Sequence, residues 1–414
     1  MPINTNAVFN RLQDQIVRDQ SFLQASYIEY ADAANSVSER DEVPNNPIMD
    51  RFLTDLGSES IRSLTNFTVS EFETLWSFVD DAMNSAWLEG RGRRSTTSPK
   101  DSFFMALTVL KHYSSWDKHA ADFGFKAPTF EKLVMRVFTV VEPVLYERLI
   151  APQSMASLAQ SGHLFANFPY AAYAVDVKFQ PSLRPMGRFA EQKRYYSGKH
   201  GLYGYKIEAA VSPEGLCVAM SSSHPGSVHD FTILHDRQAI HQAMLNKSPD
   251  EQLRPDHGEL ATQYPAQWAC LADMGYTGIG HVLRGIHPKR RPANGTLDAA
   301  DMERNERISS DRVVVENFFG RVCGLWKITY ATFSWSEKNY DIIQRTAFAL
   351  TNFHLSLMPL RYEDETFYGY VMARYERMAT DKKRKRAETQ RRYRLNRQER
   401  LALDHNRAGR LRFS

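Results

Sequence analysis

The stretch Y-A-V-D-V-K-F, residues 173–179, has the pattern of an apolar strand with Asp176 at its centre. A carboxylate in an apolar strand is costly to desolvate unless a cation or a basic side chain compensates it. Two later apolar runs also contain an acid: W-A-C-L-A-D-M-G-Y at 268–276 with Asp273, and R-V-V-V-E-N-F-F-G-R at 312–321 with Glu316. Three such acids on elements that can share a sheet indicate a metal site for phosphoryl transfer.

The segments around these acids predict a mixed five-stranded sheet with helices on its faces. The expected elements are strands at 171–179, 201–211, 215–222 and 267–273, a turn at 212–215, a helix from His229, a polar insertion over about 245–264, and helices from about Ser310 to Leu357. Asp176 is then expected on the central strand, Asp273 at the end of the neighbouring strand, and Glu316 on a helix packed across the sheet.

The helix that carries Glu316 has an apolar stripe at positions i, i+3, i+4 and i+7. The stripe consists of Val315, Phe318, Phe319 and Val322. Glu316 lies at its edge, and Arg312, one turn earlier, could steady the carboxylate or bind a phosphate. The alternative is structural, with Asp176 in an ordinary ion pair and Glu316 paired to Arg312.

Composition is that of a soluble globular protein: 414 residues, 43% hydrophobic and 24% charged, a length that predicts two or three domains. No run approaches the ~18 apolar residues of a membrane helix, and residues 1–19 lack the apolar core of a signal peptide. The cysteines Cys217, Cys270 and Cys323 show no C-x-x-C spacing, which argues against a cysteine zinc site and fits a reducing compartment.

Positive charge is concentrated at the C-terminal end of the chain. Between Lys382 and Arg412 there are 13 Lys and Arg against 3 Asp and Glu, whereas the rest of the chain has 39 against 45. A strongly basic tail indicates a polyanionic partner, and the run K-K-R-K-R at 382–386 is typical of a nuclear localisation signal. The alternative is a solvated charged helix.

The N-terminal half, from about Phe67 to Leu149, has helical periodicity. Within it, residues 116–136 resemble a helix-turn-helix, in which Gly124 forms the turn and a second helix begins near Pro128. The exposed face of the second helix would present the candidate DNA contacts Lys126, Lys132 and Arg136. A plain helical hairpin with solvated lysines is the alternative.

Six segments in order resemble the PIF/Harbinger transposase family of DDE superfamily endonucleases, which have an RNase H-like core. The segments are A-V-D-V-K-F, K-R-Y-Y-S-G-K-H-G-L-Y-G-Y-K, P-E-G-L-C, H-P-G-S-V-H-D-F-T-I-L, L-A-D-M-G-Y and R-V-V-V-E-N-F-F-G-R, within roughly 165–355. The resemblance implies a catalytic triad of Asp176, Asp273 and Glu316 that holds two Mg²⁺ (or Mn²⁺) ions. It also implies a nuclear protein that acts on double-stranded DNA at transposon terminal repeats, as a homo-oligomer and with a Myb-like partner.

The same resemblance assigns further residues. Asp230 falls on an additional acidic position, where it could cap its helix or support the metal site. Lys199 and His200 become candidate phosphate contacts. Two departures concern the grip on DNA: Met274 follows Asp273, where a Lys or Ser is usual, and Cys323 stands where a Lys is expected.

We therefore expect a variable arm (1–56), a helix-turn-helix-like DNA-binding domain (57–160), an RNase H-like DDE nuclease domain (161–360) and a basic tail (361–414). The expected activity is cleavage and joining of DNA phosphodiesters at transposon ends. The alternatives are a domesticated, non-catalytic DNA-binding or adaptor protein that keeps the fold, and a stand-alone host nuclease without preference for element ends.

Overall fold

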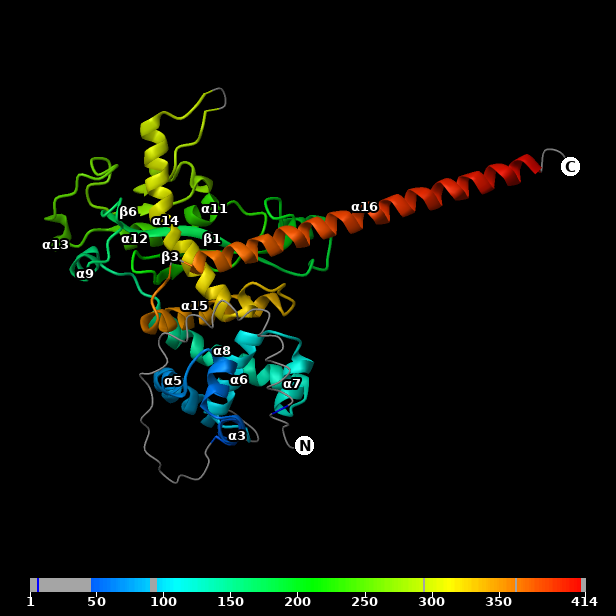
Figure 1. The fold of residues 1–414 in the computed structure, drawn as a ribbon, viewed down its shortest axis with the longest axis horizontal. Helices are drawn as coiled ribbons and strands as arrows, with labels where there is room; N and C mark the ends of the chain where they lie inside the picture. Colours follow the sequence, from blue (N-terminus) through cyan, green and yellow to red (C-terminus); the bar gives the residue numbers. More distant parts are fainter. Residues whose placement is uncertain (1–5, 7–45, 90–94, 293–294, 362, 411–414) are drawn as a thin grey trace.

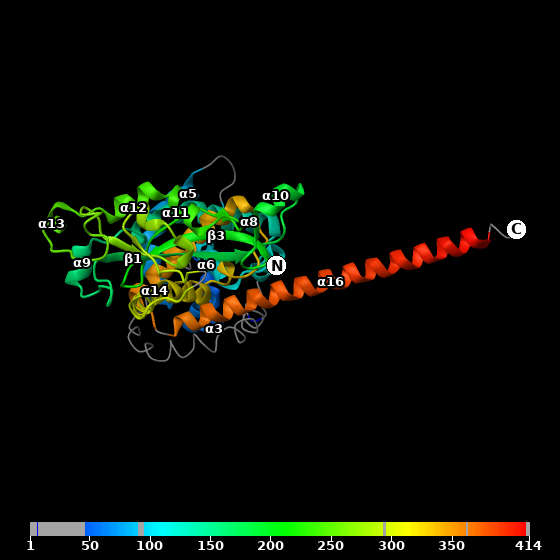
Figure 2. The same ribbon diagram turned by 90° about the horizontal axis from the view of Figure 1, so that it is seen from above.

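The computed structural model describes residues 6, 46–89, 95–292, 295–361 and 363–410 (Figure 1). Most of the expected arm at 1–56, the basic residues at 90–94 and the last four residues lie outside the described part. A helical layer packs beneath a sheet layer, and one long helix projects from the body (Figures 1 and 2). No helix in the described ranges has the length and apolarity needed to cross a bilayer.

The sheet is mixed, and its order along the main path is β2-β3-β1-β6-β7, with β4 and β5 also paired to β3. The strands are β1 (Ala171–Pro181), β2 (Tyr196–Ser197), β3 (Leu202–Val211), β4 (Cys217–Met220), β5 (His224–Pro225), β6 (Ala269–Leu271) and β7 (Gly285–Ile286). β1 is antiparallel to β3 and parallel to β6. The predicted mixed sheet with a central 171–179 strand is therefore confirmed, but the described sheet has seven strands instead of the predicted five. Three of the seven, β2, β5 and β7, are only two residues long.

The helical layer contains α3 (Pro47–Leu56), α4 (Ser58–Thr65), α5 (Val69–Leu88), α6 (Pro99–His112), α7 (Trp116–Phe123) and α8 (Ala127–Leu149). Its helix starts follow from local sequence, because Thr68, Ser98 and Ser115 each accept a backbone N–H of the first turn. Phe52 of α3 is fully buried, so this layer begins at Pro47 rather than at residue 57. The predicted turn at Gly124 is present, with φ +74° in the left-handed region.

Helices and 3-10 turns flank the sheet. They are α9 (Met155–Gln160), α10 (Phe189–Arg194), α11 (Asp230–Asp236), α12 (Gln238–Leu245), α13 (Pro249–Gln252), η2 (Met274–Tyr276), η3 (Ile279–His281), α14 (Ala299–Leu325), η4 (Lys327–Thr329), η5 (Glu337–Asn339), α15 (Tyr340–Leu357) and α16 (Asp364–Arg410). α14 packs on β1, and α15 packs on α8 of the helical layer. The expected basic tail is thus one helix, and its first part belongs to the body, because Val371 and Tyr375 are buried.

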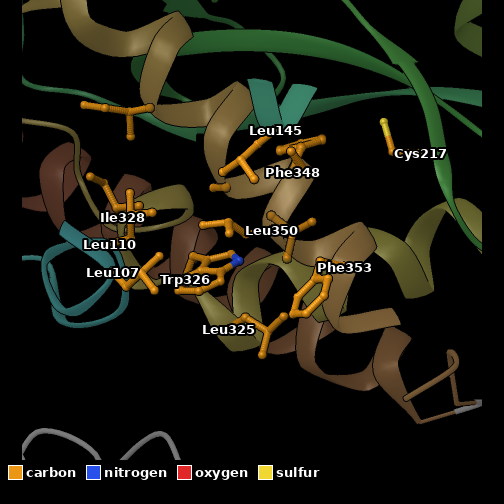
Figure 3. Close-up of a cluster of buried hydrophobic side chains, with 14 of the residues drawn as sticks. Leu107, Leu110, Leu145, Cys217, Leu325, Trp326, Ile328, Phe348, Leu350 and Phe353 are labelled. Atoms are coloured by element: carbon orange, nitrogen blue, oxygen red, sulfur yellow. The ribbon is translucent and has the colours of Figure 1, made fainter. Parts of the chain in front are cut away.

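One continuous apolar core joins the two layers (Figure 3). Trp326, at the end of α14, is fully buried between Phe67 of the helical layer and the α15 helix, where Thr351 accepts its indole N–H at 3.1 Å. Asn66 also donates to the Leu325 carbonyl across the boundary at 2.7 Å. The apolar core is therefore continuous across residue 160, where the sequence predicts a domain boundary.

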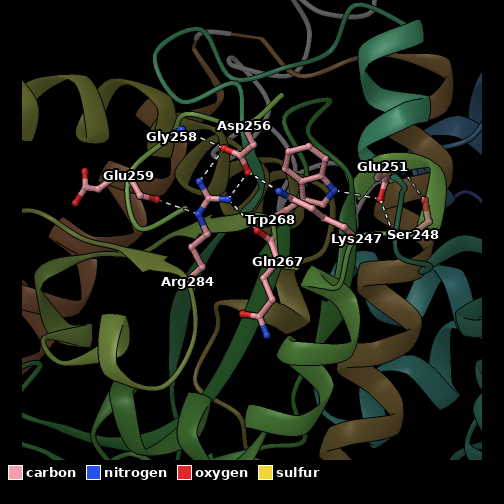
Figure 4. A network of polar contacts seen from close by, with 9 residues as sticks. All are labelled: Lys247, Ser248, Glu251, Asp256, Gly258, Glu259, Gln267, Trp268 and Arg284. Carbon is pink, nitrogen blue, oxygen red and sulfur yellow. Dashed lines mark hydrogen bonds and ion pairs between the residues drawn. The ribbon is translucent and has the colours of Figure 1, made fainter. Parts of the chain in front are cut away.

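The predicted polar insertion is held by a buried charged network (Figure 4). Asp256 accepts from Lys247 at 2.7 Å and from the Arg284 guanidinium at 2.9 Å, and Arg284 is fully buried. Glu251 accepts the Trp268 indole N–H at 3.1 Å on the same side of the network. These contacts fix a segment without a core of its own onto the end of the sheet.

Candidate active site

Asp176 lies in the middle of β1, where its backbone pairs with Ala209 of β3. Its Oδ1 accepts the Val177 backbone N–H at 2.7 Å, and its Oδ2 lies 3.3 Å from Nη2 of Arg312 on α14. The Asp176 side chain is 20% exposed, so it faces a partly open space at the α14 side of the sheet.

Asp273 lies beside Asp176 because β6 runs parallel to β1. Leu271 pairs with Ala174, and continuing this register by two residues brings Asp273 level with Asp176. Asp273 is the N-cap of η2, where its Oδ1 accepts the Gly275 N–H. It is half-buried.

Glu316 lies on α14, which crosses the sheet over β1. The predicted stripe is confirmed, since all four of its side chains are fully buried: Val315, Phe318, Phe319 and Val322. Glu316 itself is half-buried, as expected at the edge of that stripe. Helix periodicity therefore places its carboxylate at the margin between core and solvent.

The three acids line one cavity of about 730 Å³. Its other walls come from the β2–β3 turn and from the first turns of α16. These residues are Lys199, His200, Glu365, Thr366, Tyr368, Gly369, Tyr370 and Met372, and Val177 of β1 completes the lining. The structure thus brings together both the predicted acids and two of the five predicted DNA contacts.

Negative charge accumulates in this cavity. Burial raises the pKa of Asp176 to about 6, and the nearby Asp273 and Asp230 carboxylates raise it while Arg312 lowers it. Burial also raises the pKa of Glu316, to which Glu365 and Asp273 add repulsion. A site that raises the pKa of two carboxyls in this way favours protons or cations among them.

Arg312 pairs with Asp176 rather than with Glu316. The structural alternative included an ion pair at Asp176, and that ion pair is present. Arg312 supplies it from α14, so Arg312 pairs with an acid of β1 and not with Glu316 one turn away on its own helix. Arg312 is 7% exposed, and its Nε is a buried donor without a hydrogen-bond partner in the described part of the chain. Its guanidinium therefore retains a capacity to bind another acceptor at this site.

Asp230 also belongs to this neighbourhood. Its Oδ1 accepts from Lys206 at 2.9 Å, and His229 rather than Asp230 occupies the N-cap position of α11. A Cβ built on Gly275 would lie 3.1 Å from Asp273 Oδ1 and 3.3 Å from Asp230 Oδ2. The two carboxylates therefore approach each other around Gly275, and Asp230 lies beside the acidic cluster and not at the N-cap of its helix.

The two predicted phosphate contacts differ in charge and exposure. Lys199 is exposed at the cavity mouth. His200 stacks on Phe179 with ring centroids 4.3 Å apart, and burial together with Lys199 and Lys206 lowers the pKa of His200 to about 4. His200 is consequently neutral near pH 7 and can offer a hydrogen bond but no charge.

The helix-turn-helix candidates lie away from this cavity, on the helical layer. Lys126 and Lys132 are exposed. The Arg136 guanidinium instead donates to the Ala86 and Glu89 carbonyls and lies 4.7 Å from the centroid of the Trp87 ring. Arg136 therefore closes the C-terminal end of α5, a structural contact that competes with a contact to DNA.

Sequence reasoning missed the wall formed by α16. Glu365 is held in place by Asn317, whose Oδ1 accepts the Glu365 backbone N–H at 2.7 Å. The segment D-E-T-F-Y-G-Y at 364–370 combines acidic and aromatic residues, which is the only local signal that it differs from the basic tail.

The donor set fits a hard divalent cation, because carboxylate oxygens from three rigid elements are the ligands that Mg²⁺ and Mn²⁺ prefer. Among the described residues, however, no three His, Cys, Asp or Glu side chains converge closely enough to hold one ion. The contacts above give the reason: Asp176 is bound to Arg312, and Asp273 is bound to its own turn. Joint ligation requires these side chains to rotate.

Comparison with known families gives one match, which lies in the sheet layer. Residues 177–352 match the DDE superfamily endonuclease family. The match supports this superfamily, begins one residue after Asp176 and includes Asp273 and Glu316. Comparisons with curated proteins and with solved structures gave no significant match.

Proposed function

We propose that the chain is a metal-dependent DNA endonuclease of the DDE transposase type, with an RNase H-like core, and that it belongs to the PIF/Harbinger transposases. The observation that carries this proposal is that Asp176, Asp273 and Glu316 line one cavity, in a chain whose residues 177–352 match the DDE superfamily endonucleases. The substrate is double-stranded DNA, which the family match supports.

Asp176, Asp273 and Glu316 would hold two Mg²⁺ or Mn²⁺ ions. When bound, such ions lower the pKa of an attacking water and stabilise the charge on the leaving oxygen. Lys199 binds a phosphate at the mouth of the cavity, and Lys206 holds the Asp230 carboxylate near Asp273. Arg312 releases Asp176 and binds a phosphate oxygen through its unused Nε donor.

The protein's own contribution is positioning and charge complementarity. Water is the nucleophile for cleavage, and a DNA 3′-hydroxyl is the nucleophile for strand transfer. Residues 116–136 would form a helix-turn-helix that recognises element ends through Lys126 and Lys132. A nuclear location, a Myb-like partner and a homo-oligomer on DNA belong to the same proposal.

The test is nicking of supercoiled plasmid that carries the element's terminal repeats, with and without Mg²⁺. The wild-type chain should nick only with Mg²⁺, and Asp273→Asn should lower the rate at least a hundredfold. Asp250→Asn removes a carboxylate that is exposed on α13, and it should leave the rate unchanged. Equal nicking by the wild type and Asp273→Asn would refute the assignment.

The second candidate is a domesticated, non-catalytic DNA-binding protein. The Arg312–Asp176 ion pair and the dispersed carboxylates of the described residues favour it, because an inactive site can keep a guanidinium where a cation would bind. This candidate predicts that both proteins bind the terminal repeats and that neither nicks them.

A further inference from the structure

The first turn of α16 is clamped against the helix that carries Glu316. Arg321, one turn and one residue after Glu316, binds Asp364 with Nε–Oδ1 at 3.0 Å and Nη2–Oδ2 at 2.8 Å. Both side chains are nearly buried, at 3% and 8% exposure. Gly320 leaves no room for a Cβ, which would lie 2.6 Å from the Asp364 carbonyl carbon. α14 and α16 are therefore locked together beside the cavity.

A second anchor lies about three turns further along α16. Tyr375 and Ala379 are buried in a cluster with Phe179 and Leu202, and the Tyr375 hydroxyl donates to the Tyr330 carbonyl at 2.9 Å. Ala379 also approaches Gly201, just before β3, so closely that a Cβ on Gly201 would lie 3.2 Å from the Ala379 Cβ. The two anchors together fix the direction of α16 relative to the cavity.

Beyond the second anchor α16 leaves the body (Figures 1 and 2), and its side chains from Lys382 to Gln398 are all exposed. This segment has nine basic residues against one acid, Glu388. The basic residues are Lys382, Lys383, Arg384, Lys385, Arg386, Arg391, Arg392, Arg394 and Arg397. We call residues 382–398 the basic arm.

The composition of the basic arm indicates which kind of partner it binds. A second copy of the chain would need an apolar seam every three to four residues, and the arm's apolar side chains are limited to Ala387, Tyr393 and Leu395. Nine cations on an exposed helix instead match a polyanion. The cavity itself is lined by acids, which repel phosphates, so DNA that enters it needs cations close by.

We propose that the basic arm binds the phosphate backbone of the DNA duplex that flanks the bond held in the cavity, in a direction set by the two anchors of α16. This inference rests on the proposed function and names the surface that holds its substrate. At ~1.5 Å per residue the arm is about 25 Å long, the length of about seven base pairs at ~3.4 Å each. The contact is to phosphates, so it is independent of sequence.

The experiment measures binding of the full chain to a fluorescein-labelled 30-base-pair duplex of mixed sequence, in EDTA and at several NaCl concentrations. In a plot of the log of the binding constant against the log of the salt concentration, Arg391→Gln/Arg394→Gln should make the negative slope shallower by about 1.8, since each phosphate contact contributes ~0.9 to its magnitude. The matched control is Arg51→Gln/Arg254→Gln, which removes two exposed cations outside α16. It should leave the slope unchanged.

A G-G-S-G insertion after Thr380 keeps every charge but removes the rigid connection. It should preserve the salt slope and lower plasmid nicking. An unchanged salt slope in Arg391→Gln/Arg394→Gln would overturn the proposal. The proposal would also be overturned if the wild-type chain forms a dimer without DNA and the double variant is a monomer. Because binding is measured in EDTA, failure of the arm is distinguishable from failure of the nuclease assignment, which Asp273→Asn tests by nicking alone.

Discussion

Gly320→Ala is the sharpest test of how α16 is attached. The new Cβ would lie 2.6 Å from the Asp364 carbonyl carbon and closer still to the carbonyl oxygen. Both are backbone atoms at the start of a helix, so they cannot rotate away. The first turn of α16 must shift away from α14, which breaks the Arg321–Asp364 pair and the Asn317 contact to Glu365.

The magnitude follows from two opposed terms. Overpacking a well-filled site costs about 1–3 kcal/mol, and separation of the buried Arg321–Asp364 ion pair adds to that cost. Replacing a mid-helix glycine by alanine returns ~1 kcal/mol of helix propensity. We expect a net loss of about 2 kcal/mol in the free energy of unfolding, because the clash is with backbone on both sides.

Urea unfolding followed by circular dichroism gives this value, and plasmid nicking gives the consequence for the cavity. Gly369→Ala is the matched control, because Gly369 is a helical glycine of α16 and a Cβ added there would meet none of the described atoms within 4 Å. It should stabilise the fold by up to ~1 kcal/mol. If Gly320→Ala is stabilised equally, the clamp does not exist.

Two further predictions concern buried charges. Burial raises the pKa of Asp176 to about 6, so the contribution of this residue to the free energy of unfolding is fully present below its unfolded pKa of 3.8 and is lost as the pH rises through 6. Asp176→Asn should therefore flatten the dependence of stability on pH, measured by urea unfolding between pH 4 and pH 8. An unaltered pH dependence would contradict the burial of this carboxyl. Asp256→Asn leaves the fully buried Arg284 without its anionic partner and should cost about 3–5 kcal/mol in the same assay. A loss below about 1 kcal/mol would show that the network in Figure 4 is solvated.

The sequence predicts three of the four acidic residues that line the cavity, because Asp176, Asp273 and Glu316 each interrupt an apolar pattern whose period gives its element. An apolar run sets Asp176 on the central strand, and a helical stripe sets Glu316 at the margin of its helix. Both predictions depend on local periodicity alone. The parallel pairing that brings Asp273 level with Asp176 follows from the order of strands.

The remaining features depend on tertiary contacts that local patterns do not contain. Arg312 has Glu316 one turn away, yet the crossing of α14 over β1 gives it Asp176 instead. Glu365 reaches the cavity only because Gly320 and Arg321 dock a segment that begins at Asp364, far along the chain. A basic run indicates charge but not that its helix begins beside the cavity that the acids line.

The most direct test of the central claim is a crystal structure of the full chain soaked in Mn²⁺, with the metal located by anomalous scattering. We predict a peak in the cavity with oxygens of Asp176, Asp273 and Glu316 within about 2–2.6 Å and with Arg312 displaced from Asp176. No peak in the cavity, with the Arg312–Asp176 pair intact at saturating Mn²⁺, would contradict the account and favour the non-catalytic DNA-binding protein.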